Sequence, residues 1–298
     1  MAEVIVTGGS GFTGSRLILK LLSEGHRVIA LARSEVSKAK ISGLGAEVRM
    51  GNLDDFLSIQ TIFKEFPDAH LANIASMGFG SGPNVVKAAT ESGIKRSLFV
   101  STTSIFTSLP TSSKPVRLEA EYAVKSSDLD WTIIRPTMIY GAPGDRNMER
   151  LLRYIKRSRV ALLPLPGHGQ ALQQPVNVYD LIEGISEALF STKAIKGEYN
   201  LGGPEPMTLK ETFETAALAV GNRAHFISLP ISPLVKGAQY MSKIFGKSPI
   251  SAEQIQRLDE NKNVSIADAI RDLNYQPRTF KEGIEQEWNL ICQVMPDR

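Results

Sequence analysis

The stretch IVTGGSGFTG, residues 5–14, decides the fold, because its glycines join a short apolar run to a helical pattern. Residues 3–8 are rich in β-branched side chains and predict a strand, whereas residues 11–26 carry leucine and isoleucine at helical spacing. A glycine loop between a strand and a helix presents free N–H groups and the positive end of the helix dipole. The stretch therefore predicts a site for the phosphates of a nucleotide.

The glycines of this loop can be read in two overlapping frames. Gly9, Gly11 and Gly14 spell G-x-G-x-x-G, and Gly8, Gly11 and Gly14 spell G-x-x-G-x-x-G. Either frame lets the backbone turn tightly and approach a pyrophosphate closely. The two frames are typical of different enzyme families, and the loop alone leaves the choice open.

Five further apolar runs follow and alternate with helical patterns. They lie at residues 27–33, 46–53, 69–75, 97–103 and 130–137. Continuous apolar strands that alternate with helices are typical of a parallel sheet covered on both faces. The sequence therefore predicts an α/β protein built on a doubly wound parallel Rossmann sheet.

The composition of the sequence changes after residue 141, where glycine and proline become frequent. Four capping boxes predict helix starts in this part, at Asp180–Glu183, Thr208–Glu211, Ser251–Gln254 and Thr279–Glu282. We predict an NAD(P)-binding Rossmann domain from residues 1–141 together with about 174–203. We predict a smaller C-terminal substrate-binding lobe from residues 142–173 and 204–298.

The residues after the second predicted strand bear on the choice of nucleotide. An acidic side chain about 20 residues after the glycine loop usually binds the ribose hydroxyls of NAD. Here the text is ALARSE, residues 30–35, so Arg33 and Ser34 stand where that acid is expected. A guanidinium suits a 2′-phosphate, which favours NADP over NAD. The alternative is that Arg33 is a solvated strand end.

Composition narrows the function classes. Of the 298 residues, 42% are hydrophobic and 22% are charged, and the net charge of +3 is too small to indicate nucleic-acid binding. No apolar run approaches the about 18 residues of a membrane span. The single cysteine, Cys292, excludes a disulfide within the chain, and we expect a cytoplasmic protein. The histidines show no metal-ligand spacing, so we expect no metal site.

The text TGGSGFTG, with Thr7 before the glycines, resembles the short-chain dehydrogenase/reductase superfamily, in particular its atypical and extended NAD(P)-dependent epimerase/dehydratase branch. The resemblance continues at 51–55, 98–106, 132–141, 174–185 and 197–212. Residues 229–264 and 272–284 are similar to the group around the 39-kDa accessory subunit of respiratory complex I. The branch uses the frame of Gly8, Gly11 and Gly14.

The resemblance implies which residues contact the coenzyme. Asn52 and Leu53 correspond to an Asp-Leu adenine contact, and the backbone around Pro136 lies against the nicotinamide. The full set of expected coenzyme contacts is Thr7, Gly8, Gly11, Phe12, Thr13, Gly14, Arg33, Ser34, Asn52, Leu53, Ala75, Ser101, Arg117 and Pro136.

Active members of the superfamily use a Tyr-x-x-x-Lys pair for proton transfer, and the chain departs from that pattern. The family frame places Ser113 and Arg117 at these two positions. A serine hydroxyl is a poor acid, and arginine keeps its proton. Tyr122 is spaced one residue short, which turns its side chain by about 100° on a helix, so we expect it at the surface.

Other residues are candidates for the chemistry. Thr102 takes the place of the catalytic Ser/Thr that orients the substrate oxygen. Lys114, Tyr140 or a water molecule would handle the proton, and Thr103 and His168 are candidate substrate contacts, with a loop histidine as the alternative for His168. No arginine is near Gln173 in the sequence, which argues against a nucleotide-sugar substrate. Asp180 is explained as a helix N-cap.

Two function classes follow. The first is an NADP-dependent oxidoreductase or epimerase-like enzyme that acts on a small carbonyl or carbinol compound. The second is a non-catalytic protein that binds NADP(H) for structure, sensing or assembly, which the missing Tyr-Lys pair supports. A homodimer is a common state in this superfamily.

Overall fold

The computed structural model describes residues 1–294 except 146, 159, 234, 238–239, 241–255 and 258. Its centre is a seven-stranded sheet in the order β11-β6-β5-β4-β1-β2-β3, in which every neighbouring pair is parallel. The strands are β1 (Glu3–Thr7), β2 (Arg27–Ala32), β3 (Glu47–Met50), β4 (His70–Asn73), β5 (Arg96–Val100), β6 (Asp130–Pro136) and β11 (Gly197–Leu201). The predicted doubly wound α/β fold is confirmed.

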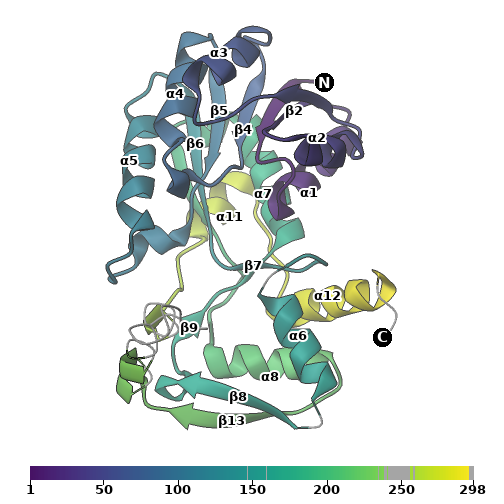
Figure 1. The fold of residues 1–298 in the computed structure, drawn as a ribbon, viewed down its shortest axis with the longest axis vertical. Helices are drawn as coiled ribbons and strands as arrows, with labels where there is room; N and C mark the ends of the chain where they lie inside the picture. The colour runs from purple at the N-terminus through teal and green to yellow at the C-terminus, as the bar shows by residue number, and fades with distance from the viewer. Residues whose placement is uncertain are drawn as a thin grey trace.

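Helices cover both faces of this sheet (Figure 1). One face carries α1 (Phe12–Ser23), α2 (Glu35–Ser42) and α7 (Val178–Phe190), and the other carries α3 (Phe56–Lys64), α4 (Gly82–Glu91) and α5 (Ser113–Lys125). Side chains alternate along β1. Val4 and Val6 pack in the core beneath α1, α2 and α7, and Ile5 packs in the core beneath α3, α4 and α5. This two-sided burial explains why β1 is apolar from Val4 to Val6.

The polypeptide order reverses between β1 and β4, which are neighbours in the sheet although β2 and β3 lie between them in sequence. Ligands of doubly wound folds bind in the crevice at such a reversal, beyond the carboxyl ends of the strands. The glycine loop follows β1, and residues 74–76 follow β4. Both loops therefore meet at this crevice.

A smaller lobe lies beyond the carboxyl ends of the strands (Figure 1). It has its own apolar core, to which residues of α6, β8, α8 and α12 contribute. Its elements are α6 (Met148–Arg157), β8 (Ala161–Pro166), η3 (Gly167–Gly169), β9 (Leu172–Gln173), β12 (Met207–Thr208), α8 (Leu209–Ala219), β13 (Ala224–Leu229) and α12 (Phe280–Val294). The short strands β7 (Ile139–Tyr140) and β10 (Val176–Asn177) pair where the chain passes between the sheet and the lobe.

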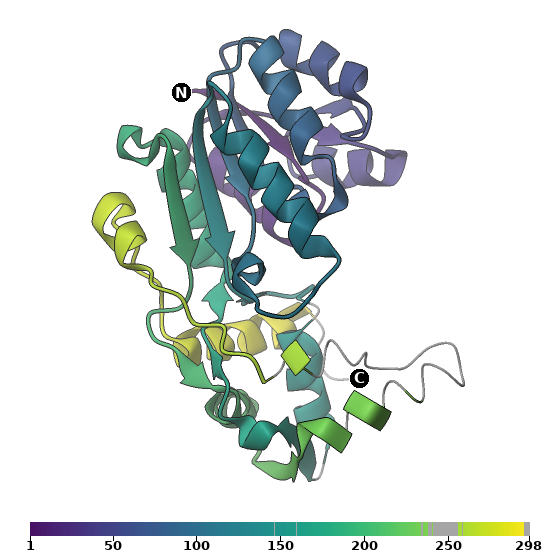
Figure 2. The ribbon, with the colours of Figure 1, turned by 90° about the vertical axis from the view of Figure 1, so that its left-hand side faces the viewer.

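The chain crosses between the two parts once more near its C-terminus. Figure 2 shows the yellow-green segment rising from the lobe to the sheet, where α11 (Ala267–Leu273) lies beside β11, before the chain returns as α12. Ile266, Ala269 and Leu273 pack into the core of the large domain, although the predicted boundaries assign them to the lobe. The domain boundaries stay a prediction. None of the described helices is long and apolar enough to span a membrane.

The capping boxes had mixed outcomes. Thr208 and Thr279 each form the predicted box with the glutamate three residues later. The prediction for Asp180 is wrong, because α7 begins at Val178 with Asn177 as its cap. The Asp180 carboxylate instead accepts hydrogen bonds from the backbone and guanidinium of Arg278. The box at Ser251–Gln254 lies outside the described residues.

Candidate functional site

The glycine loop is packed so tightly that two of its glycines admit no side chain. A Cβ on Gly14 would lie 2.2 Å from the carbonyl oxygen of Gly8. Gly8 has φ +69°, and a Cβ there would lie 2.7 Å from the backbone nitrogen of Ala75. A Cβ on Gly9 would instead meet side-chain atoms, and the nearest of them is the far end of the Ile18 side chain at 2.7 Å. The backbone contacts thus support the frame of Gly8, Gly11 and Gly14.

Thr7 joins this loop to the neighbouring strand. Its hydroxyl donates to Asn73 Oδ1 at 2.6 Å and accepts from the backbone nitrogen of Ala75 at 3.3 Å. Thr7 is fully buried. It therefore fixes the spacing of the β1 and β4 ends, and Ala75 is the backbone partner that it holds.

A cavity of about 320 Å³ lies against the glycine loop, and we call it the glycine-loop cavity. It brings together nine of the sequence-predicted residues: Gly8, Gly11, Phe12, Thr13, Gly14, Ser101, Thr102, Arg117 and Pro136. The structure adds Ile74, Ser76, Met77, Val100, Thr137 and Ile139, which sequence reasoning missed. These residues lie at the end of β4, β5 or β6 or shortly after it, where the carboxyl ends of the three strands meet at the crevice.

One polar atom of this wall lacks a partner. Ser101 Oγ is buried and has no hydrogen-bonding partner among the described residues. Buried hydroxyls are usually paired, so this atom fits a wall that contacts a polar ligand. Together with the glycine cradle, the residues present fit a dinucleotide whose pyrophosphate lies on the loop.

The predicted adenosine-side residues lie outside that cavity. Ser34 caps α2 by accepting from the backbone nitrogen of Ser37, and Arg33 is exposed at the end of β2. Asn52 is exposed as well and its side chain accepts from the backbone nitrogen of Asp54, with Leu53 half-buried beside it. Sequence reasoning missed Lys40, whose Nζ donates to the carbonyl of Ser10 in the glycine loop at 2.5 Å.

Arg117 and Ser113, which the resemblance predicts at the positions of the family's Lys and Tyr, contact each other. The guanidinium of Arg117 donates to Ser113 Oγ and lies so close over Gly78 that a Cβ there would meet it at 2.8 Å. Burial lowers the pKa of Arg117 below its usual value, and the charge of Arg257 adds to this effect. Among the described residues, no tyrosine lines the glycine-loop cavity, and Tyr122 is exposed.

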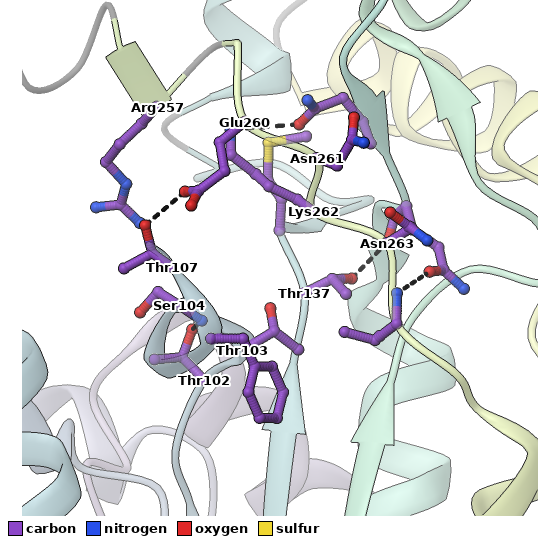
Figure 3. Close-up of a pocket in the computed structure, with 15 residues that line it drawn as sticks. Thr102, Thr103, Ser104, Thr107, Thr137, Arg257, Glu260, Asn261, Lys262 and Asn263 are labelled. Carbon is purple, nitrogen blue, oxygen red and sulfur yellow. Dashed lines mark hydrogen bonds between the residues drawn. The ribbon is translucent and has the colours of Figure 1, made fainter. Parts of the chain in front are cut away.

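A second cavity, of about 550 Å³, opens beside the first (Figure 3). Residues 260–264, which we call the strap, form one wall of it, so we call it the strap cavity. Thr102 and Thr137 line both cavities. Thr102 Oγ1 accepts from the backbone nitrogen of Ser104 at 3.2 Å, which leaves its O–H able to donate to a ligand. Thr103 also lines the strap cavity and donates to the carbonyl of Pro136 at 3.3 Å.

Three of the residues predicted for catalysis or substrate contact line neither cavity. Lys114 Nζ donates to the carbonyl of Thr107 at 2.5 Å near the start of α5. His168 lies in a left-handed backbone conformation and its Nδ1 pairs with Ser228 Oγ at 2.6 Å. Tyr140 is 1% exposed and packs on the Phe280 ring, and burial raises the pKa of its hydroxyl above the usual value. A side chain in this core cannot exchange a proton with a ligand in the strap cavity, which corrects the expectation for Tyr140.

Charged residues of the strap region were missed as site residues. Arg257, Glu260 and Lys262 line the strap cavity together with Gln173 and Gln174. Burial lowers the pKa of Lys262 to about 8, the charge of Arg257 adds to this, and Glu260 opposes it. The sequence signal is the polar run DENKN, 259–263, which is far from the strand ends in sequence. Arg257 also weakens the argument that an arginine is missing near Gln173.

Residues 8–161, just over half of the chain, match the model of the NAD(P)H-binding family. A 2-alkyl-3-oxoalkanoate reductase of Stenotrophomonas maltophilia is 23% identical, over 95% of this chain and 98% of the relative. A UDP-glucose 4-epimerase of Vibrio cholerae is 22% identical, over 98% of this chain and 96% of the relative. The crystal structure of a Thermus thermophilus UDP-glucose 4-epimerase in complex with NAD has a TM-score of 0.77 at 21% identity, covering 98% of this chain and 100% of that one. The likeness to the 39-kDa group stays a prediction.

Proposed function

Because the chain belongs to the NAD(P)H-binding family and has relatives among the short-chain dehydrogenases/reductases and epimerases, we propose that it is an NADP-dependent oxidoreductase of a small carbonyl or carbinol compound. The observation that carries this proposal is that Thr102 lines both cavities. A hydroxyl at that junction can meet a substrate oxygen beside a bound coenzyme. The oxo group in the name of the Stenotrophomonas reductase supports a carbonyl substrate over a nucleotide sugar.

Each part of the proposed reaction has its residues in this chain. The backbone of Gly8, Gly11 and Gly14 holds the pyrophosphate, and Ser101 and Arg117 line the wall beside it. The coenzyme, when bound, supplies or accepts a hydride. Thr102 donates a hydrogen bond to the substrate oxygen and stabilises the negative charge that develops there. With Tyr140 buried and Lys114 outside the cavity wall, a water molecule is our candidate for the proton.

An assay of turnover tests this proposal, and the Thr102→Ala variant tests the role of the Thr102 hydroxyl. We expect wild-type protein to oxidise NADPH with members of a panel of aldehydes, ketones and quinones. Loss of one hydrogen bond costs about 1.4 kcal/mol, so Thr102→Ala should lower kcat roughly tenfold. NADPH binding, followed by its fluorescence, should stay unchanged. The exposed Thr61→Ala on α3 is the matched control, and an unchanged kcat in Thr102→Ala would contradict the role of Thr102.

The preference for NADP is proposed from Arg33, which is exposed at the end of β2 and one residue before the cap of α2. Arg33→Asp should weaken NADPH binding by about tenfold, because it exchanges a cation for an anion beside the 2′-phosphate. NADH, which lacks that phosphate, should bind as before. Fluorescence titration of both coenzymes measures the two dissociation constants, and Arg33→Met separates lost attraction from new repulsion. Equal losses for NADPH and NADH would argue against the assignment.

A non-catalytic NADP(H)-binding protein is the second candidate. The contact between Arg117 and Ser113 favours it, because these two side chains stand where active relatives have a proton-transfer pair. Tight binding of NADPH without turnover across the whole panel would support this candidate over the first. A cytoplasmic location and a homodimer stay predictions.

A further inference from the structure

We propose that the strap cavity takes a substrate that carries a carboxylate, held by Lys262 Nζ and the side-chain amide of Gln173. This inference rests on the proposed function, because it names the substrate class of the same site. The carbonyl of that substrate would lie at Thr102 and the carboxylate at the other end of the cavity. Figure 3 shows Thr102 and Lys262 apart on the cavity wall, on η2 (Thr103–Phe106) with its flanking residues and on the strap.

The strap holds Lys262 in place through bonds on both sides of it. The backbone nitrogen of Leu172 donates to Asn261 Oδ1, and the backbone nitrogen of Lys262 donates to the carbonyl of Leu172, both at 2.8 Å. The backbone nitrogen of Val264 donates to Gln174 Oε1, also at 2.8 Å. The Lys262 side chain is thus mounted on a fixed backbone, which lowers the entropy lost when it binds a ligand.

The polar end of the cavity has one buried donor without an acceptor and a lysine with only a long hydrogen bond. Gln173 is only 4% exposed and its Oε1 accepts from Lys262 Nζ at 3.4 Å, a long hydrogen bond. Gln173 Nε2 is buried and has no partner among the described residues. An unpaired buried donor costs about 1–3 kcal/mol. Lys262 is desolvated as well, as its lowered pKa indicates. An acceptor oxygen with a negative charge would satisfy both groups.

The charges that line the cavity favour a single negative charge on the ligand. Arg257, Glu260 and Lys262 are the charged residues of its described wall. The Glu260 carboxylate is already hydrogen-bonded to the large domain. It accepts from Thr107 Oγ1 at 2.5 Å and from the backbone nitrogen of Ser108 at 2.7 Å. Two cations and one anion leave a net charge of +1, which a carboxylate neutralises. A phosphate dianion or a diphosphate carries more negative charge than this wall can neutralise.

Calorimetry with a matched acid and ester tests this inference without turnover. The protein is saturated with NADP⁺, which cannot reduce a ketone, and titrated with 3-oxohexanoate or with methyl 3-oxohexanoate. We expect the acid to bind at least tenfold more tightly than the ester. Lys262→Met should remove that preference by weakening the acid alone. Lys210→Met, which removes an exposed lysine of α8, is the control, and thermal unfolding verifies that both variants are folded.

Other outcomes would overturn the inference. Equal affinities for the acid and the ester would do so, and so would tighter binding of dihydroxyacetone phosphate or UDP-glucose than of the acid. In steady-state assays, a fall in kcat for acid and ester alike with unchanged KM would show that Lys262 transfers a proton instead. An absence of heat with NADP⁺ would count against the proposed function, whereas titration of the coenzyme-free protein would still compare acid with ester.

Discussion

Replacing Gly14 by alanine is expected to weaken coenzyme binding by at least about 100-fold, which corresponds to about 2.7 kcal/mol. The added Cβ would lie 2.2 Å from the carbonyl oxygen of Gly8, a backbone atom that no side-chain rotation can move. The helix α1 must then move away from the loop, and its N–H groups move away from the pyrophosphate. Fluorescence titration with NADPH measures the loss, and circular dichroism with thermal unfolding shows whether the variant retains its fold.

Gly9→Ala is the matched control within the same loop. Its Cβ would meet the terminal methyl of Ile18, which can move by a side-chain rotation. We expect NADPH to bind this variant within a few-fold of wild type. Gly9→Ala also separates the two glycine frames, because the frame of Gly9, Gly11 and Gly14 predicts a large loss for this variant as well as for Gly14→Ala. If Gly14→Ala bound NADPH normally, the loop would not hold the pyrophosphate and the proposed function would lose its basis.

The fold could be predicted from the sequence because its signals are local. Each strand of the large domain up to β6 is an apolar run with a glycine, proline or polar residue near its end, and the structure trims these runs by only a few residues. The seventh strand, β11, lies next to β6 but follows it by many residues. The sequence analysis anticipated β11 only by expecting that residues of about 174–203 return to the sheet. No local sequence pattern tells which strand an edge strand pairs with.

The candidate site was predictable only where it follows the strand ends. The glycine loop and the residues after β5 and β6, such as Thr102 and Pro136, come together because parallel strands end at one edge. Lys262 reaches the cavity through a strap whose path depends on hydrogen bonds to β9, and no periodicity encodes such a path. The expectation for Tyr140 was wrong because of another long-range contact. The Phe280 side chain, on a helix distant in sequence, packs on Tyr140 in the core.

The helix that buries Tyr140 also brings a carboxyl into the core of the lobe. Glu287 on α12 is fully buried, and its Oε2 accepts from the backbone nitrogen of Gly141 at 3.1 Å. Its Oε1 has no partner among the described residues. Burial raises the pKa of Glu287 to about 8, and the charges of Asp145 and Glu149 add to this while Gly141 and Arg16 oppose it. Glu287 is thus a buried acid that the proposed reaction does not use.

Glu287→Gln is expected to stabilise the protein above neutral pH. The carboxyl has an ordinary pKa of 4.5 when unfolded and about 8 when folded, so between these pH values the unfolded chain gives up a proton that the folded chain retains. The wild type should therefore lose unfolding free energy as pH rises from 5 to 8, by roughly 3 kcal/mol from this group at about 1.4 kcal/mol for each pH unit. A glutamine keeps the acceptor for Gly141 and cannot ionise, so the variant should lack this slope.

Urea unfolding at pH 5, 6, 7 and 8 measures the slope, with Tm recorded beside it. At pH 8 the variant should unfold at a higher urea concentration and a Tm raised by roughly 5 °C, and at pH 5 the two proteins should nearly coincide. Glu285→Gln is the matched control, because Glu285 is exposed on the same helix and should follow the wild-type slope. Parallel pH profiles for wild type and Glu287→Gln would show that the buried carboxyl ionises at an ordinary pH. The lobe would then carry a negative charge beside Gly141, where the chain leaves β7.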